Sequence, residues 1–278
     1  MTSSLSGARI GFLERRHPPW HRGSVTAQLV PRLRGRGARV DLVHAEEGGR
    51  RLDAKPPWDL VVLKSGSTAA LHLAAAVEAH GVPCVNSSAA TFIARDKLAS
   101  TAILRHAGLP TPCSLLASLG PDQPVDGLAD LVDRSWAVKS ARSSQGKGLW
   151  ITAGERLPAL AATVPSGPYL LMELVEHSGD DLKVFVAGAW LSAIERAFPA
   201  RTLAEKRGRP VLVPGEVATA SREVGRRLGL TCFGCDFVCT PRGWTLVDVN
   251  AFPGYKGAAD APRALTAEIE KAVTGVTP

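Results

Sequence analysis

The sequence predicts a mixed fold in which an α/β domain precedes a region of α+β type built on antiparallel sheets. Two observations predict it. Within the first 90 residues, short runs rich in Val, Ile and Leu alternate with segments of helical spacing, as in a parallel sheet covered by helices. Beyond about residue 135, strand-like runs are joined by short turns, which is typical of antiparallel pairing. At 278 residues and 45% hydrophobic content, the chain is long enough for one to three modules with full cores.

The first 90 residues are expected to form a small α/β domain. Apolar runs predict its strands. Helical spacing of apolar residues predicts its first helix, and a capping residue followed by Gly81 at the far end predicts its second helix. Ligand-binding loops are expected where the parallel strands end. The expected strands are 8–13, 38–45, 59–64 and 82–87, and the expected helices are 24–36 and 65–81.

The remainder is expected to form two further units, 91–168 and 169–278. Leu98, Ile103 and Leu104 indicate one face of a helix within 90–112, which Gly108 and Pro110 end. A polar linker is expected next. The further expected elements are a strand–loop–strand at 136–153, a short helix, a strand at 169–177, two strands at 180–198 joined at Gly188, a helix at 216–229, and a closing hairpin that ends in WTLVDVN.

The net charge of +7 fits either nucleic acid or an anionic small molecule as the partner. No five basic residues are consecutive and no basic stretch is interleaved with aromatic residues, so the small molecule is favoured and nucleic acid is not expected. No apolar run approaches the ~20 residues of a membrane span. The N-terminus does not resemble a signal peptide, and five scattered cysteines fit a reducing compartment, so a cytoplasmic location is expected.

Three oxygen-bearing residues lie on the closing hairpin. Asp248 and Asn250 are two residues apart, so they point to the same face of a strand. If Pro241–Gly243 is a three-residue loop and Thr240 faces Trp244, Asp236 lies opposite Asp248. Opposed carboxylates repel, and a cation between them would remove the repulsion. The set suits Mg²⁺, which proteins hold with one or two carboxylates plus substrate phosphates, although a solvated acidic face is an equal alternative.

A glycine-rich loop follows Lys139 at the end of a predicted strand. Ser143, Ser144 and Gln145 lead into Gly146-Lys147-Gly148, and such a loop can close over phosphates through its backbone N–H groups. Lys139 would supply a point charge to the same phosphates. Neither a Walker loop nor a dinucleotide fingerprint is present, and an ordinary hairpin loop is the alternative interpretation.

The order of these motifs resembles the ATP-grasp superfamily over nearly the whole chain. The segments that carry the resemblance are ARDKLAS (94–100), KSARSSQGKG (139–148), LMELVE (171–176), DLKVFVAG (181–188) and GCDF…LVDVNAFPG (234–254). RDKLAS, SSQGKG and VFVAG…AIERAF are similar to the RimK-type amino-acid ligases. DLKVFVAG and DVNAFPGYKG are similar to the ATP-grasp inositol polyphosphate kinases. The resemblance implies that the antiparallel sheets clasp a nucleotide.

The resemblance also implies roles for individual residues. Lys97 and Lys139 would contact the phosphates of ATP, and Ser143 to Gly148 would form the mobile loop above them. Glu173, Leu174 and Val175 would be the hinge whose backbone contacts adenine. Asp181, or alternatively Glu176, would bind the ribose. Asp236, Asp248 and Asn250 match the family's ligands for Mg²⁺ or Mn²⁺, with Asp248 in place of the Glu that is usual in the ligases.

Several basic residues are candidates for an acceptor site. Lys64 ends a predicted strand, and Lys183 and Arg196 lie on neighbouring strands of the large domain. Lys183 and Arg196 are also the candidate catalytic residues, because positive charge stabilises a transferring phosphoryl group. Arg142 lies beside the glycine-rich loop. Arg15, Arg16 and His17 follow the first strand and would cap the same cleft, although for Arg15 and Arg16 a solvated surface position is the stronger interpretation.

Three functions fit these features. The first is an ATP-dependent carboxylate–amine ligase that activates a carboxylate as an acyl phosphate and joins it to an amino acid or peptide. The second is a kinase of an inositol-phosphate-like or other small anion; Lys64 and Lys183 lie where the inositol kinases carry substrate lysines. The third is a nucleotide-binding module without turnover. The ligase is favoured because the RimK-like segments are the more extensive.

Overall fold

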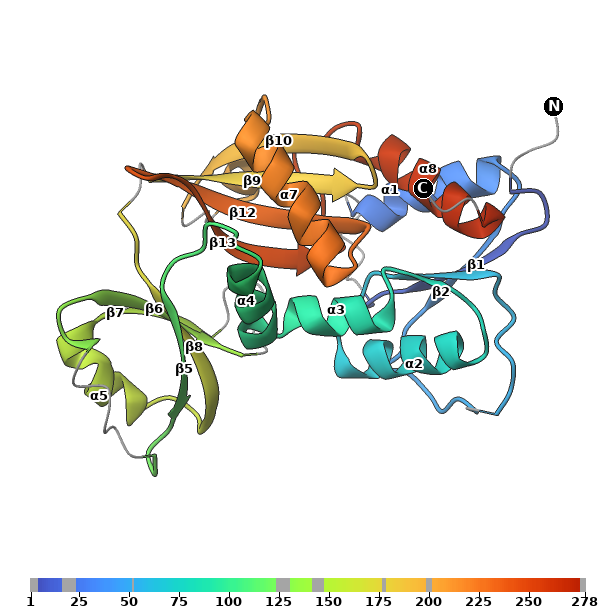
Figure 1. The fold of residues 1–278 in the computed structure, drawn as a ribbon. Helices are drawn as coiled ribbons and strands as arrows, with labels where there is room; N and C mark the ends of the chain where they lie inside the picture. Colours follow the sequence, from blue (N-terminus) through green and yellow to red (C-terminus); the bar gives the residue numbers. More distant parts are fainter. Residues whose placement is uncertain are drawn as a thin grey trace.

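The computed structural model describes residues 5–16, 24–51, 53–123, 131–141, 148–176, 179–198 and 202–275. These residues form three sheets flanked by helices (Figure 1). Sheet A has the strand order β2-β1-β3-β4, sheet B has the order β5-β8-β6-β7, and sheet C has the order β11-β10-β9-β12-β13. The predicted fold class is confirmed, because sheet A is parallel and the other two sheets are antiparallel.

Sheet A is the N-terminal domain that the alternating pattern predicted. Its side chains alternate between two cores: Phe12 packs with helix α1 on one face, and Leu13 packs with helix α2 on the other. Serine hydroxyls cap both helices, since Ser24 accepts from the N–H of Ala27 and Ser67 from that of Ala70. The elements are β1 (Arg9–Leu13), α1 (Val25–Gly35), β2 (Arg39–Val43), β3 (Leu60–Leu63), α2 (Thr68–Ala79) and β4 (Cys84–Val85).

The next segment differs from the expectation of one helix. It forms α3 (Ser88–Arg95) and α4 (Lys97–His106), with a break at Asp96. The Asp96 carboxylate accepts hydrogen bonds from the N–H groups of Leu98 and Ala99, both at 3.0 Å, so it caps α4 and starts a new helix direction. This break places Lys97 at the first turn of α4, where it faces sheet C.

Sheet B forms a separate lobe, visible at the left of Figure 1. The segment that was expected to be a polar linker contains the edge strand β5. Leu115 and Leu116 of this strand are both exposed, so the strand lacks the alternation of buried and exposed residues that would have predicted it. The boundary expected at residue 168 falls inside β8, which pairs with both β5 and β6. The elements are β5 (Ser114–Leu119), β6 (Ser135–Ser140), β7 (Leu149–Ala153), the 3₁₀ turn η2 (Gly154–Arg156), α5 (Leu157–Ala161) and β8 (Gly167–Glu173).

Sheet C carries the late hairpin. Gly188 makes the predicted turn between β9 and β10 with a φ of 56°, and α7 packs on the sheet through Val217, Val224 and Leu228. Two short elements, α6 and β11, were not predicted. The elements are β9 (Asp180–Ala187), β10 (Trp190–Ala197), α6 (Leu203–Arg207), β11 (Arg209–Val211), α7 (Gly215–Leu228), β12 (Cys232–Thr240) and β13 (Gly243–Ala251).

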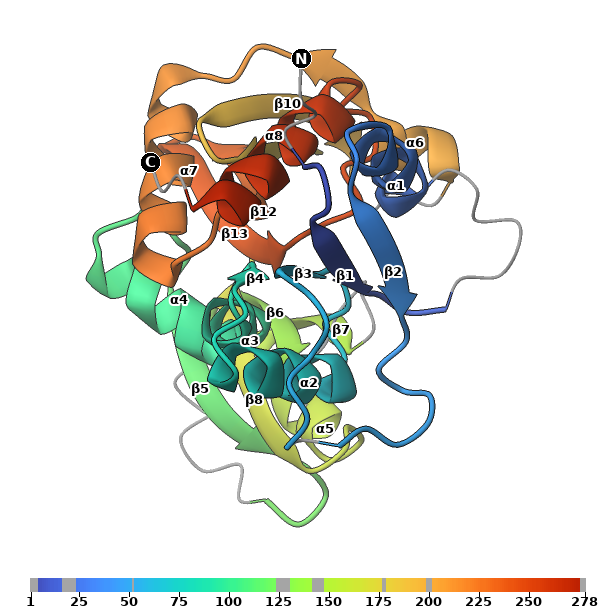
Figure 2. The same ribbon diagram turned by 90° about the vertical axis from the view of Figure 1, so that its right-hand side faces the viewer.

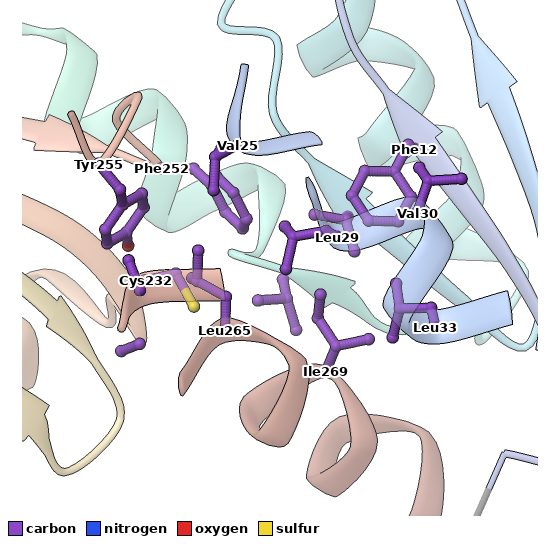
Figure 3. Close-up of a cluster of buried hydrophobic side chains, with 14 of the residues drawn as sticks. Phe12, Val25, Leu29, Val30, Leu33, Cys232, Phe252, Tyr255, Leu265 and Ile269 are labelled. Atoms are coloured by element: carbon purple, nitrogen blue, oxygen red, sulfur yellow. The ribbon is translucent and has the colours of Figure 1, made fainter. Parts of the chain in front are cut away.

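The last helix, α8 (Ala261–Thr274), was also not predicted, and it joins sheet C to the N-terminal domain. Figure 2 shows α8 beside α1. One buried cluster contains Phe12 and Leu29 from the first domain together with Phe252, Leu265 and Ile269 from the end of the chain (Figure 3). The N-terminal domain and sheet C therefore share a core rather than meeting at a polar interface.

A buried side chain, that of Asn86, makes a second connection between these two parts. Its Oδ1 accepts from the backbone N–H groups of Thr231 and Cys232 at 2.9 and 2.8 Å, and its Nδ2 donates to the Cys232 carbonyl at 2.7 Å. The amide thus fixes the start of β12 from the first domain. Among the helices that the structure describes, none has the length and apolarity required to cross a bilayer.

Candidate active site

The β12–β13 hairpin places Asp236 opposite Asp248, as predicted, but by a different route. The connection is a two-residue loop, with Thr240 paired to Gly243, and Gly243 has a positive φ of 102°. A β-bulge then shifts the register, because Phe237 pairs with Leu246 and Asp236 pairs with Asp248. Val247 is the extra residue. Without this bulge the two carboxylates would not face each other.

The three predicted metal ligands lie side by side. Asn250 Nδ2 donates to Asp248 Oδ2 at 3.1 Å and to Asp236 Oδ2 at 3.3 Å. Asp236 lies in the middle of β12, and Asp248 and Asn250 lie near the end of β13, the strand that contacts α3. The hairpin thus presents two carboxylates and an amide within one hydrogen-bonded group.

Cations surround this acidic group. Lys183 Nζ lies 2.5 Å from Asp236 Oδ1, and Lys97 forms an ion pair with Asp248. Arg196 binds both oxygens of Asp181 at 2.8 and 2.7 Å and also reaches Asp236 Oδ1 at 3.3 Å. Asp181 and Arg196 face each other across the β9–β10 pair.

The charges of this cluster keep its key carboxylate ionised. Burial alone would raise the pKa of Asp248, but the Lys97 and Lys139 ammonium groups outweigh it and lower that pKa to about 2. Burial raises the pKa of Asp181, which the Arg196 guanidinium only partly opposes. Four cations, with Lys139 included, stand against three carboxylates. The surplus positive charge favours an anionic ligand.

Both lysines expected at the phosphates reach strand β13. Lys139 Nζ donates to the carbonyl of Val247, the bulge residue, at 2.9 Å, and Lys97 Nζ donates to the Val249 carbonyl at 3.2 Å. A hollow of about 20 Å³ lies between them and Asp248. That volume holds about one water molecule, so this hollow does not accommodate a nucleotide as it stands.

The donor set fits a magnesium or manganese ion. Hard oxygen ligands from one or two carboxylates, completed by phosphate oxygens, are what Mg²⁺ prefers. No group of three or more His, Cys, Asp or Glu side chains suited to a metal occurs in the described part of the chain, so Asn250 would be an essential third ligand here.

The expected nucleotide-binding segments lie at the same junction of sheets. Glu173, at the end of β8, bonds Arg134 at 3.0 Å, and Leu174 N–H donates to the Ser135 carbonyl at 2.8 Å. Val175 is half-buried and Glu176 is exposed. The loop residues Ser143, Ser144, Gln145, Gly146 and Lys147 lie outside the described residues, whereas Gly148 lies inside them and its carbonyl accepts from Ser140 N–H at 3.0 Å.

Asp181, the predicted ribose-binding residue, is buried and already paired. It is only 3% exposed, and Arg196 holds both of its oxygens. Sequence reasoning named both residues but missed that they pair. The pairing could have been predicted from the two-residue turn at Gly188, because this turn sets the register in which Asp181 lies opposite Arg196. A ribose contact by Asp181 remains a prediction, and the exposed Glu176 remains the alternative.

Lys64, a candidate acceptor residue, lies beside the segment that follows the hairpin. Its Nζ donates to the Phe252 carbonyl at 3.0 Å and lies 5.9 Å from the Phe252 ring centroid, two residues beyond Asn250. Burial lowers the pKa of Lys64 to about 8. Arg15 and Arg16 line a different hollow of about 320 Å³, together with His44 and Ser67. Arg142 and His17 lie outside the described residues.

Comparison with known proteins agrees with this geometry. No protein-family model matches the chain. A probable alpha-L-glutamate ligase of Thioalkalivibrio sulfidiphilus is 30% identical over 218 residues, which cover 73% of this chain and 72% of that protein. A probable alpha-L-glutamate ligase of Pasteurella multocida is 31% identical over 194 residues, which cover 64% of this chain and 60% of that protein.

Solved structures share the fold. A RimK domain ATP-grasp protein of Sphaerobacter thermophilus superimposes with a TM-score of 0.73 at 17% identity, covering 96% of this chain and all of that one. The D-alanine–D-alanine ligase of Bacillus anthracis complexed with ATP gives 0.68 at 17% identity, covering 97% and 95%. The fold is that of the ATP-grasp superfamily. Within it, the chain belongs to the RimK-like family of the probable alpha-L-glutamate ligases.

Proposed function

We propose that the chain is an ATP-dependent carboxylate–amine ligase that joins an amino acid or peptide to a carboxylate. One observation carries the proposal. The side chains of Asp236, Asp248 and Asn250 form one hydrogen-bonded group on the β12–β13 hairpin, and the ammonium groups of Lys97 and Lys183 pair with its two carboxylates. Such an arrangement neutralises the charge of a transferring phosphoryl group, which is most of what an enzyme contributes to that reaction.

The nucleotide would bind between sheets B and C. Lys97 and Lys139 would exchange their present carbonyl and carboxylate partners for phosphate oxygens, and the segment 143–148 would cover the triphosphate. Backbone groups of Glu173 to Val175 would contact adenine. A bound Mg²⁺ or Mn²⁺ ion supplies charge neutralisation at the phosphates, held by Asp236, Asp248 and Asn250.

The reaction would proceed in two steps. An oxygen of the substrate carboxylate attacks the γ-phosphorus, the bond to ADP breaks, and an acyl phosphate forms. An amine then attacks the acyl carbon, loses a proton, and displaces phosphate to leave an amide. Lys183 and Arg196 lie beside Asp236, where their charge stabilises both the incoming carboxylate and the phosphoryl group.

The substrate class follows from charge and from the family. Lys64, Lys183 and Arg196 would give the acceptor side a cationic character that suits a carboxylate. The names of the relatives point to glutamate, so L-glutamate is the first amino acid to try as a substrate. The absence of a basic run in the sequence supports a small molecule rather than nucleic acid as the partner.

Product analysis tests the proposal. Purified protein is incubated with ATP, Mg²⁺ and pools of amino acids, dipeptides and inositol phosphates, and ADP, free phosphate and new amides are measured. A ligase forms equal amounts of ADP, phosphate and amide, and requires both a carboxylate and an amine. ADP without free phosphate, with a phosphorylated acceptor, identifies a kinase instead. No ADP with any pool identifies a nucleotide-binding module without turnover.

A further inference from the structure

Three cations that the proposed reaction does not use gather at the surface beyond the hairpin. Lys206 and Arg207 end helix α6, and Lys256 lies in the turn that follows β13. All three residues are exposed, and neither an ion pair nor a hydrogen bond joins their side chains to any residue that the structure describes. Basic residues are common in the last turn of a helix, but here a third cation comes from a different segment of the chain.

The turn that carries Lys256 is fixed on both sides of this residue. Tyr255 is only 4% exposed, and its hydroxyl donates to the Val186 carbonyl at 2.9 Å. Gly257 has a φ of 87°, and a Cβ atom at this position would lie 2.0 Å from the Arg207 carbonyl oxygen, so only glycine allows the approach. Lys256, between these two anchored residues, is therefore held beside the end of α6.

Helix α6 is fixed as well, by a capping box at its first turn. The Thr202 hydroxyl accepts from the Glu205 N–H, and the Glu205 carboxylate accepts from the Thr202 N–H, both at 3.1 Å. The carboxylate of this helix is thus engaged at its N-terminal end, whereas Lys206 and Arg207 lie at its C-terminal end. The cations are held together by the fold and not by an acidic side chain between them.

The three positive charges act on one another. Partial burial lowers the pKa of Lys256, and the charges of Lys206 and Arg207 lower it further, with no carboxylate of the described residues opposing them. The positive charge also extends toward the hairpin, because Lys256 acts on Lys64, whose ammonium donates to the Phe252 carbonyl. A group of cations without counter-ions favours an anionic ligand.

Charge indicates which anion fits. A phosphate monoester has a charge of about −2 above its second pKa and three acceptor oxygens, whereas a carboxylate has one charge and two oxygens. Three cations therefore match a phosphate better than a single carboxylate. Lysine binds phosphate as a point charge, and the arginine guanidinium can bind two of its oxygens at once.

We propose that Lys206, Arg207 and Lys256 form a binding site for a phosphate group of the carboxylate substrate, separate from the carboxylate that reacts. The inference rests on the proposed function, because it specifies which carboxylates the ligase accepts. The reacting carboxylate would lie at the hairpin, and the phosphate group would lie at the end of α6. The substrate class is therefore a small molecule that carries both a carboxylate and a phosphate monoester.

Equilibrium dialysis with radiolabelled inorganic phosphate tests the site without turnover. The full chain is first saturated with Mg²⁺ and a non-hydrolysable ATP analogue, so that the nucleotide site cannot take up the phosphate, and sodium chloride keeps the ionic strength constant. Wild type is expected to bind phosphate saturably. Unlabelled acetate is expected to compete at least about tenfold less well than unlabelled phosphate, because it offers less charge and fewer oxygens to the three cations.

Variants assign the binding to residues. Lys256→Met, and the double variant Lys206→Met with Arg207→Met, are each expected to weaken phosphate binding about tenfold or more, since each removes a charged hydrogen bond. Lys256→Arg keeps the charge and should retain binding. Lys55→Met removes one positive charge from an exposed residue in the segment before β3, and this matched control should bind as wild type does. Circular dichroism checks the fold of every variant, and the affinity for the ATP analogue should be the same in all.

Four results overturn the site. Wild type binds no phosphate, acetate competes as well as phosphate, or Lys256→Met binds phosphate no more weakly than Lys55→Met does. In the fourth, Lys256→Met weakens binding of the ATP analogue, which would assign the cations to the nucleotide.

Failure of the proposed function is a different outcome. It would appear as no ADP, phosphate and amide in the product assay with phosphorylated carboxylates added to the pools. Phosphate binding that Lys256→Met weakens, without amide formation, would then keep the phosphate site and reject the ligase. Conversely, turnover that is as fast with a carboxylate lacking a phosphate group as with its phosphorylated counterpart would support the ligase and reject the role of this site.

Discussion

Two charged regions of this molecule differ in how their charges are satisfied. At the β12–β13 hairpin and the neighbouring strand β9, the protein supplies a bonded partner for each of Asp181, Asp236 and Asp248. At the edge of sheet A, Glu14 and Lys64 lie near each other without an ion pair. If the hairpin binds metal and nucleotide, its present ion pairs must be exchanged for bonds to the ligand. At the sheet edge, one buried carboxylate oxygen of Glu14 has no hydrogen-bond partner among the described residues, so mutations should affect the two regions differently.

The largest effect is expected from removing the hairpin oxygens. Asp248→Ala or Asn250→Ala should lower ADP release by about 100-fold or more, because a ligand for the metal and the phosphates is lost. Steady-state assays with circular dichroism as a folding check measure this. Asp260→Ala removes an exposed carboxylate and is the control. Full turnover in both hairpin variants would remove the metal assignment.

A large stability effect is expected at the buried pair. Arg196→Met leaves Asp181 buried at 3% exposure without its guanidinium partner, which should lower the free energy of unfolding by about 3 kcal/mol. Urea unfolding followed by fluorescence measures it. The double variant Arg196→Met with Asp181→Leu should recover most of the loss, since no unpaired charge remains. A single variant as stable as wild type would show that the pair is not what holds β9 to β10.

A moderate effect is expected from pH at Lys64. Its folded-state pKa is about 8, below the unfolded value, so the ammonium form that binds a carboxylate is complete below pH 8 and is lost as the pH rises through it. The KM for the carboxylate substrate should therefore rise above about pH 8. The KM for ATP should not change. Lys64→Met should have a high KM for the carboxylate at all pH values, and an unchanged pH profile in that variant would contradict the assignment.

The smallest effect is expected at an exposed charge cluster on α7. Glu223 accepts bonds from Arg226 and Arg227 at 2.8 and 2.6 Å on the solvent side of the helix. Glu223→Gln should lower the melting temperature only slightly and leave turnover unchanged, because exposed ion pairs contribute little. Thermal unfolding at low and high salt measures it. A marked loss of turnover would mean that α7 has a role beyond covering sheet C.

Much of the fold could be predicted because the spacing of apolar residues along the sequence differs between strands and helices. The parallel domain, the Gly188 turn and the hairpin all followed from local pattern. Strand β5 could not be predicted, because Leu115 and Leu116 are exposed on it and the alternation is lost. The helix break at Asp96 depends on one side chain capping α4, which a search for apolar periodicity does not detect.

On the hairpin, the sequence predicted which residues lie together but not the bonds that they make. The opposition of Asp236 and Asp248 was predicted from a three-residue loop, yet it arises from a shorter loop compensated by a bulge at Val247. The pairing of Asp181 with Arg196 and the open position at Glu14 depend on burial and on three-dimensional proximity. Neither burial nor proximity in space can be derived from residue type and spacing alone.

The side chain of Asn86 limits how the enzyme can open. Because this amide hydrogen-bonds the backbone of Cys232 as a neighbouring strand would, and because α8 shares a core with α1, we expect sheets A and C to move together. If the molecule opens to exchange nucleotide, we expect the lobe of sheet B to move and the hydrogen bond from Lys139 to Val247 to break.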